Sequence, residues 1–141
     1  MSKLGPIILA DDDPDDKEFF ADVLKELGIQ NPLVHFQTAL EAFDFLKTTS
    51  SHPFIIFSDV NLPKLSGLEF KRRIDDDPEL RKKSIPFVFY STSVDQRSVN
   101  EAYTKMTVQG FFQKGSSIET LKKDLKLILD YWSLCRHPNA G

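Results

Sequence analysis

Cysteine is almost absent from this sequence: its 141 residues include only Cys135. One cysteine excludes an internal disulfide and any zinc site made from several cysteines. The three histidines, His35, His52 and His137, are scattered, and we treat them as incidental. A chain of this length can form one hydrophobic core without disulfide or metal support.

Excess positive charge is also missing. The chain has 18 Lys and Arg against 21 Asp and Glu, a net charge of −3. A mildly acidic chain without a dense basic tract is a poor candidate for binding nucleic acid. The amino terminus has neither the apolar run of a signal peptide nor that of a membrane span. We therefore expect no nucleic-acid or membrane partner, and a reducing, cytoplasmic setting.

Short apolar runs alternate with stretches of helical periodicity. The runs predict strands at 7–10, 33–37, 54–57, 86–90 and 110–113. Apolar residues at helical spacing predict buried faces made by Phe20, Val23, Leu24 and Leu27; by Ala39, Ala42, Phe43 and Leu46; by Val99, Ala102, Tyr103 and Met106; and by Ile118, Leu121, Leu125, Ile128, Leu129 and Trp132. A short helix is expected at 68–74, and 75–84 is expected to be a charged connector with a solvated Asp75-Asp76-Asp77.

The first helix has clear start and stop signals. Asp13 followed by Pro14 predicts an N-cap and a first helical residue. Asp15 and Asp16 then fall in the first turn, where negative charge meets the positive end of the helix dipole. Gly28 predicts the end of this helix.

Strand and helix thus alternate five times, which predicts an α/β fold with a five-stranded parallel sheet and helices on both faces. We expect one domain over residues 1–141, with its core at about 7–132 and a polar tail at 135–141. A second apolar stripe on the last helix, Leu127, Tyr131 and Leu134, could be extra core or a partner or dimer surface.

Polar side chains follow four of the five strands. Alone, Asp59 could simply end a strand, because Asp disfavours strands and favours turns. In a parallel sheet, however, the carboxyl ends of all strands lie at one edge, where such folds place their sites. The residues expected at that edge are Asp11, Asp12, Asp59, Ser91, Thr92 and Lys114.

These groups make chemical sense together. Closely spaced carboxylates repel one another unless a cation neutralises them. Oxygen ligands without His or Cys favour a hard ion, Mg²⁺ rather than zinc. A lysine and a hydroxyl beside that ion are suited to holding phosphoryl oxygens.

The whole pattern resembles a CheY-like response-regulator receiver domain. The resemblance rests on the acidic pair after the first strand, on Asp59 with Asn61-Leu62-Pro63 following, on Ser91-Thr92 and on Lys114, and it covers about residues 7–132. It implies a flavodoxin-like strand order of 2-1-3-4-5. The pair Val108-Gln109 and the ending Tyr131-Trp132 are similar to the short regulators paired with bacterial phytochromes.

The resemblance also implies roles for single residues. Asp59 matches the phosphoacceptor, which becomes an aspartyl phosphate. Asp11, Asp12 and Asp59, with the backbone carbonyl of Asn61, match the ligands of Mg²⁺. The phosphate-binding and switch residues would be Ser91, with Thr92 as the alternative one position on, Lys114 and the aromatic Phe111. The family's usual proline after the lysine is replaced here by Gly115.

The implied function is that of a single-domain bacterial response regulator, not an enzyme. Its partners would be a histidine kinase, which could be of the phytochrome type, and a downstream target or phosphotransfer protein, and it could form a homodimer. A phosphorylation-independent adaptor and a phosphorelay intermediate are the alternatives.

Three other classes fit less well. A haloacid-dehalogenase-type phosphatase needs a second Asp where Asn61 stands. A flavodoxin needs phosphate donors where the first loop is acidic. An EF-hand needs a glycine and a glutamate that the 11–16 segment does not supply.

Overall fold

The structure is a computed structural model that describes residues 3–92, 95–115 and 117–136. Strands and helices alternate along it. In chain order they are β1 (Ile7–Ala10), α1 (Pro14–Glu26), β2 (Leu33–Phe36), α2 (Ala39–Thr48), β3 (Ile55–Ser58), α3 (Gly67–Asp76), α4 (Pro78–Lys83), β4 (Phe87–Ser91), α5 (Gln96–Lys105), β5 (Gly110–Gln113) and α6 (Ile118–Leu134).

The five strands form one parallel sheet in the order β2-β1-β3-β4-β5, so the expected fold class is confirmed. Ala10 at the end of β1 pairs with Ser58 at the end of β3. The residues that follow, Asp11 and Asp59, are therefore brought to adjacent positions. Ser91 at the end of β4 pairs with Gln113, which directly precedes Lys114.

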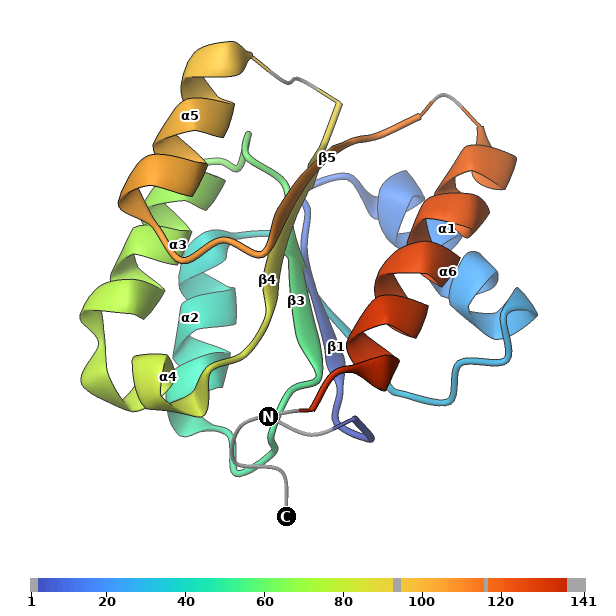
Figure 1. Cartoon of the computed structure of the whole chain (residues 1–141), viewed down its shortest axis with the longest axis horizontal. Coiled ribbons are helices and arrows are strands. Elements are labelled where there is room, and N and C mark those ends of the chain that lie inside the picture. The colour runs from blue at the N-terminus through green and yellow to red at the C-terminus, as the bar shows by residue number, and fades with distance from the viewer. Residues whose placement is uncertain (1–2, 93–94, 116, 137–141) are drawn as a thin grey trace.

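Two apolar layers sandwich the sheet. Helices α2, α3, α4 and α5 cover one face, and α1 and α6 cover the other (Figure 1). Strand residues alternate between the layers: Ile8 and Ile56 face the first, and Ile7 and Phe57 face the second. The central strands β1, β3 and β4 are buried along their whole length, as expected for a parallel sheet covered by helices.

Helix α1 begins and ends where the sequence predicts. The Asp13 side chain accepts a 2.9 Å hydrogen bond from the Asp15 N–H, and Pro14 is the first helical residue. After α1, Gly28 has φ = +72°, a left-handed conformation that glycine adopts without strain.

The charged connector predicted for 75–84 is wrong, because helix α4 occupies most of it. The Asp77 side chain accepts from the N–H groups of Glu79 and Leu80 and also forms a 2.8 Å ion pair with Lys47 of α2. Leu80 is buried, so α4 adds one apolar side chain to the core. Asp77-Pro78 repeats the start signal of Asp13-Pro14.

Asp75 is not solvated either. It forms a 2.9 Å ion pair with Lys71, whose side chain is 4% exposed. It also accepts hydrogen bonds from the N–H and the hydroxyl of Thr107, at 3.1 and 2.8 Å. The Lys71 ammonium lies 5.2 Å from the centre of the Phe87 ring. This polar cluster joins α3 to the loop before β5, at the edge of the sheet opposite Asp59.

Some residues on the predicted helical stripes are exposed. Tyr103 is 53% exposed and Ile118 is 47% exposed, so neither is a core residue. Leu127, Tyr131 and Leu134 are 62%, 62% and 86% exposed, which excludes the extra-core interpretation of that stripe.

Gln109 completes the start of β4. Its side-chain oxygen accepts a 2.7 Å hydrogen bond from the Phe87 N–H, and its own N–H donates to the Phe87 carbonyl.

Residues 137–141 of the expected tail, which include His137, lie outside the described residues. Within the described ranges, every helix is too short or too polar for a transmembrane span.

Candidate functional site

Asp59 stands directly after β3, at the carboxyl edge of the sheet. Its N–H donates to the carbonyl of Ala10, which extends the pairing of β1 and β3 by one residue. Its Oδ1 accepts hydrogen bonds from the Asn61 N–H at 3.0 Å and from the Ser91 hydroxyl at 2.8 Å. The side chain is 11% exposed. The Asn61 N–H and the Ser91 hydroxyl thus fix Oδ1, and Oδ2 is left to face Lys114.

Gly67, the first residue of α3, lies under the backbone of Asp59. A Cβ at this position would overlap the Asp59 carbonyl oxygen and would lie 3.0 Å from the Val60 Cα. The Gly67 N–H also donates to the Val60 carbonyl at 2.8 Å. Only glycine allows the helix to begin this close to the strand end.

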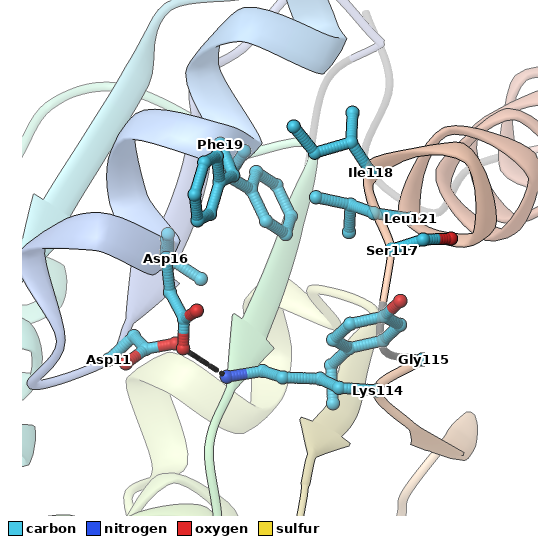
Figure 2. A pocket seen from close by; sticks show the side chains of 11 residues that line it. Asp11, Asp16, Phe19, Lys114, Gly115, Ser117, Ile118 and Leu121 are labelled. Atoms are coloured by element: carbon cyan, nitrogen blue, oxygen red, sulfur yellow. Dashed lines mark hydrogen bonds and ion pairs between the residues drawn. The ribbon is translucent and has the colours of Figure 1, made fainter.

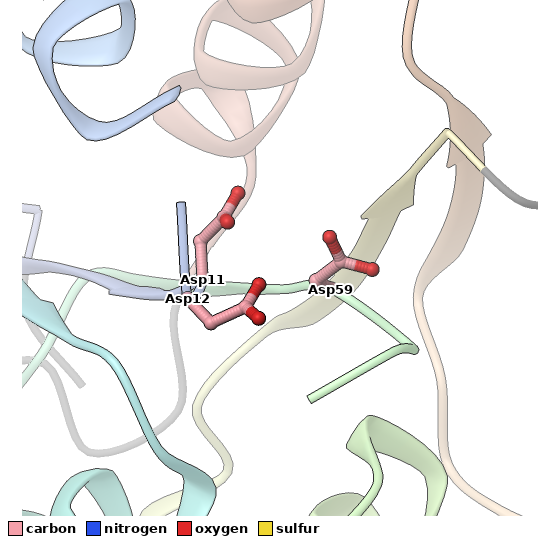
Figure 3. A group of neighbouring side chains, drawn as sticks. All are labelled: Asp11, Asp12 and Asp59. Carbon is pink, nitrogen blue, oxygen red and sulfur yellow. The ribbon is translucent and has the colours of Figure 1, made fainter. Parts of the chain in front are cut away.

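Asp11 and Asp12 follow β1 and face Asp59. One carboxylate oxygen from each of the three residues can be chosen so that all lie within 4.8 Å of one another (Figure 3). Asp11 is buried, with 2% exposure, whereas Asp12 is exposed. Asp11 Oδ1 accepts a 2.9 Å hydrogen bond from the Asp13 N–H, which fixes its orientation at the start of α1.

Lys114 comes from the end of β5 and reaches across the sheet edge. Its Nζ lies 2.7 Å from Asp11 Oδ2, 2.9 Å from Asp16 Oδ2 and 3.3 Å from Asp59 Oδ2. Its backbone N–H donates to the Ser91 carbonyl at 2.9 Å. No cis peptide bond occurs in the described residues, so the bond to Gly115 is trans.

The charges in this cluster do not balance, because three carboxylates surround one ammonium. Burial alone would lower the pKa of Lys114, but the contacts with Asp11, Asp16 and Asp59 outweigh burial and raise it. Burial raises the pKa of Asp11, and the hydrogen bond from Lys114 offsets this only in part. The cluster therefore keeps an excess of negative charge that a further cation would neutralise.

Ser91 and Thr92 differ in burial and in their contact with Asp59. Ser91 is fully buried and its hydroxyl reaches Asp59, whereas Thr92 is exposed. Asn61 is exposed and contributes its backbone N–H to Asp59. Phe111 is half-buried and packs against Phe89, with ring centres 5.3 Å apart.

Two residues of the cluster were not expected from the sequence. Asp16 was interpreted only as a helix-dipole residue, but it is an ion-pair partner of Lys114. His35 was treated as incidental, but its Nε2 lies 2.6 Å from the Asp11 carbonyl oxygen. Because a carbonyl can only accept, Nε2 carries the proton of that bond. No local motif marks either contact, since each depends on elements that meet only in the folded chain.

The residues fit a divalent cation. The donors are carboxylate oxygens, the ligands that Mg²⁺ and related hard ions prefer, and they carry more negative charge than Lys114 neutralises. The arrangement places the fixed Asp59 carboxylate, two further carboxylates that could share a metal ion with it and the Lys114 ammonium side by side.

Comparison with known proteins agrees with this geometry. The family of response regulator receiver domains matches residues 7–126. The response regulator Rcp1 of Synechocystis sp. is 30% identical over 131 residues, which cover 89% of this chain and 87% of that protein. The polar-differentiation response regulator DivK of Brucella ovis is 25% identical, over 84% of this chain and 94% of DivK.

Solved structures give the same result. The phosphorylated cyanobacterial phytochrome response regulator RcpA superposes with a TM-score of 0.85 at 26% identity, covering 95% of this chain and 98% of that one. The Mn²⁺-bound form of Rcp1 has a TM-score of 0.81 at 29% identity, covering 94% and 97%. The chain therefore belongs to the response regulator receiver domain family.

Proposed function

We propose that this chain is a phosphorylation switch whose phosphoacceptor is Asp59. A carboxylate oxygen of Asp59 attacks the phosphorus of a phosphohistidine on a histidine kinase. The bond between phosphorus and the imidazole nitrogen breaks, the kinase histidine leaves with the electron pair of that bond, and an aspartyl phosphate forms. The observation that supports this most strongly is the convergence of Asp59 with Asp11, Asp12 and Lys114 at one edge of the sheet.

The side chains of Asp11, Asp12 and Asp59, with the backbone carbonyl of Asn61, would hold Mg²⁺. When bound, Mg²⁺ supplies positive charge next to the phosphoryl oxygens. Lys114 supplies a second positive charge, and its extended side chain already lies against Asp59. Ser91 is within reach to donate a hydrogen bond to an oxygen attached to Asp59.

The phosphoryl group carries about 1.5 to 2 negative charges and replaces the single negative charge of the Asp59 carboxylate. The Ser91 hydroxyl then turns toward the new oxygens, Lys114 pairs with them from its place beside Asp59, and the shift of Ser91 opens space into which Phe111 rotates. The change reaches the surface of α5, β5 and α6 as a shift in population between two states. On this surface the exposed side chains of Leu127, Tyr131 and Leu134 offer an apolar contact for a target or for a second copy.

The partners we propose are a histidine kinase and a downstream target or phosphotransfer protein. The likeness to Rcp1 and to the phytochrome regulator RcpA favours a kinase of the phytochrome type. In this role the chain is a cytoplasmic signalling domain that carries a phosphoryl group and not an enzyme with a turnover of its own.

The test is phosphorylation of the purified chain by acetyl phosphate with Mg²⁺, followed by intact mass. Wild type should gain the mass of one phosphoryl group, and Asp59→Asn should gain none. Uptake by Asp59→Asn would overturn the choice of acceptor. A folded wild type that takes no phosphate from acetyl phosphate or from any kinase in a phosphotransfer panel would favour a phosphorylation-independent adaptor. Light scattering of the phosphorylated form tests the homodimer.

A further inference from the structure

Lys114 has one anionic partner that is not part of the candidate cation site. Asp16 Oδ2 lies 2.9 Å from Lys114 Nζ, closer than Asp59 at 3.3 Å. The Lys114 side chain is 11% exposed and that of Asp16 is 34% exposed, so the pair is partly shielded from water. Asp16 is absent from the group of carboxylates that could share a metal ion, Asp11, Asp12 and Asp59.

The start of α1 leaves Asp16 available for this contact. Asp16 is the third helical residue after the N-cap Asp13, and an acidic side chain there often turns back to the N-cap N–H. Here the Asp13 N–H donates to Asp11 Oδ1 instead. In Figure 2 the Asp16 side chain points down from α1 toward Asp11 and the end of Lys114.

The other two partners of Lys114 have a second task under the proposed function. Asp11 and Asp59 are candidate cation ligands, and Asp59 is also the proposed phosphoacceptor. Each must share its carboxylate between Lys114 and the groups that arrive during the reaction. Asp16 has no such second task, so its bond to Lys114 can persist while those groups are bound.

A cavity, not packed side chains, adjoins the ion pair of Lys114 and Asp16. The cavity has a volume of about 230 Å³, and its lining includes Asp16, Phe19 and Ile118. Without Asp16, the ammonium has Asp11 and Asp59 as its remaining anionic neighbours within 4 Å in the described chain. Its position would then depend on the same two carboxylates that the cation and the phosphoryl group require.

We infer that Asp16 is a positioning residue for Lys114. It holds the ammonium beside Asp59 from outside the cation site, so that Lys114 stays in place when Asp11 and Asp59 take up their other ligands. This inference rests on the proposed function, because it assigns Asp16 a part in phosphoryl transfer to Asp59.

The two ways in which Asp16 could act on the reaction, by positioning Lys114 or by its charge alone, predict opposite effects of Asp16→Asn on the rate of phosphorylation. Asp16→Asn removes one negative charge near the site, which by itself favours the approach of an anionic phosphodonor. Loss of a positioning contact instead slows the transfer, because Lys114 is no longer held against Asp59. Outer partners of site residues typically contribute about 10-fold or more to activity, so we expect a reduction of about 10-fold.

Asp15→Asn is the matched control. Asp15 lies in the same turn of α1, is exposed and carries the same charge, and its structural contact is made by its backbone N–H with Asp13. The experiment compares wild type, Asp16→Asn, Asp16→Glu and Asp15→Asn in their initial rate of phosphorylation by acetyl phosphate with Mg²⁺. Slow transfer in Asp16→Asn alone, with recovery of rate in Asp16→Glu, supports the inference. An equal or faster rate in Asp16→Asn overturns it.

A second measurement requires neither metal nor phosphate. The NMR signal of the Lys114 ammonium in the metal-free protein reports how firmly the group is held. It should broaden through exchange with water in Asp16→Asn and remain sharp in Asp15→Asn. A wild type that takes no phosphate would refute the proposed function, and the ammonium signal would still decide whether Asp16 holds Lys114. Identical signals in both variants would refute the contact.

Discussion

The Ser91 hydroxyl donates a 2.8 Å hydrogen bond to Asp59 Oδ1, and Ser91 is completely buried. The carbonyl of Ser91 also accepts the backbone N–H of Lys114. One residue at the end of β4 therefore contacts the proposed acceptor through its side chain and the β5 end through its backbone. We therefore expect a change in the ligands of Asp59 to act on the position of β4 and on the start of the Lys114 loop.

Replacing Ser91 by alanine should separate accepting a phosphoryl group from responding to it. Ser91→Ala removes one buried hydrogen bond and should cost about 1 kcal/mol of unfolding free energy. Asp59 should still be phosphorylated, but the NMR shifts of β5 on phosphorylation should shrink. Ser58→Ala is the control, because the Ser58 hydroxyl bonds the Asp59 carbonyl and not its carboxylate. Full-sized β5 shifts in Ser91→Ala would contradict the proposed switch.

Gly67→Ala should damage both the fold and the site. Alanine is the better helix former by about 1 kcal/mol, but its Cβ would overlap the Asp59 carbonyl oxygen. We expect a net loss of about 2 kcal/mol in urea unfolding and slower phosphorylation, because the Asp59 backbone must move. Gly28→Ala should cost about 1 kcal/mol through its positive φ and leave phosphorylation unchanged. Normal phosphorylation in Gly67→Ala would show that Asp59 tolerates the displacement.

The buried pair of Lys71 and Asp75 should respond unequally to loss of either partner. Asp75→Asn leaves the Lys71 ammonium buried without its counterion and should cost about 3 kcal/mol. Lys71→Met leaves Asp75 its two hydrogen bonds from Thr107 and fills the same space with apolar atoms, so its cost should be about 1 kcal/mol. Urea unfolding measures both. Equal losses would mean that the pair is stabilised mainly by its mutual attraction.

Asp75 should also make the free energy of unfolding depend on pH. Burial would raise its pKa, but the Lys71 ammonium and the Thr107 hydrogen bonds outweigh burial and lower it. A carboxyl whose pKa is lowered in the folded state stabilises the fold fully above its unfolded pKa of about 3.9 and loses this contribution as pH falls through the folded value. Wild type should therefore lose stability below about pH 4 more steeply than Asp75→Asn. Parallel curves for the two proteins in urea unfolding would exclude this contribution.

The acidic cluster predicts an effect of divalent cations on stability. Mg²⁺ should raise the unfolding temperature of wild type, and EDTA should block its phosphorylation. Asp12→Asn relieves repulsion, so without metal it should unfold about 3 °C higher than wild type, but it should gain nothing from Mg²⁺. Differential scanning calorimetry with and without Mg²⁺ tests this. A less stable Asp12→Asn in EDTA would mean that the three carboxylates do not repel one another in the folded protein.

Sequence patterns predicted the sheet and the residues at its carboxyl edge, because strands in a parallel sheet end on one side whatever their order. They did not predict contacts between distant elements. Asp16 meets Lys114, and His35 meets Asp11, only after β2, β5 and α1 have assembled. These pairs lie 98 and 24 residues apart in the chain.

Helix α4 shows a different reason for failure. Its start signal, Asp77-Pro78, is the same as that of α1, but its six residues contain only Leu80 as a buried side chain. A helix this short has too few apolar residues to show a period. Asp77-Pro78 is a start signal without the apolar stripe that accompanies Asp13-Pro14 in α1. Likewise, the spacing of Lys71 and Asp75 suits an ion pair on a helix, but nothing local shows that the pair is buried.

Helix α3 is held at both of its ends. Gly67 abuts the Asp59 backbone, and Asp75, in the last turn, is fixed by Lys71 and Thr107. A helix held in this way lacks the loose ends from which exchange of amide hydrogens normally begins. Its amides should therefore exchange with solvent as one unit. We expect the rate at which the whole helix opens to equal the rate at which Gly67 moves away from the Asp59 backbone.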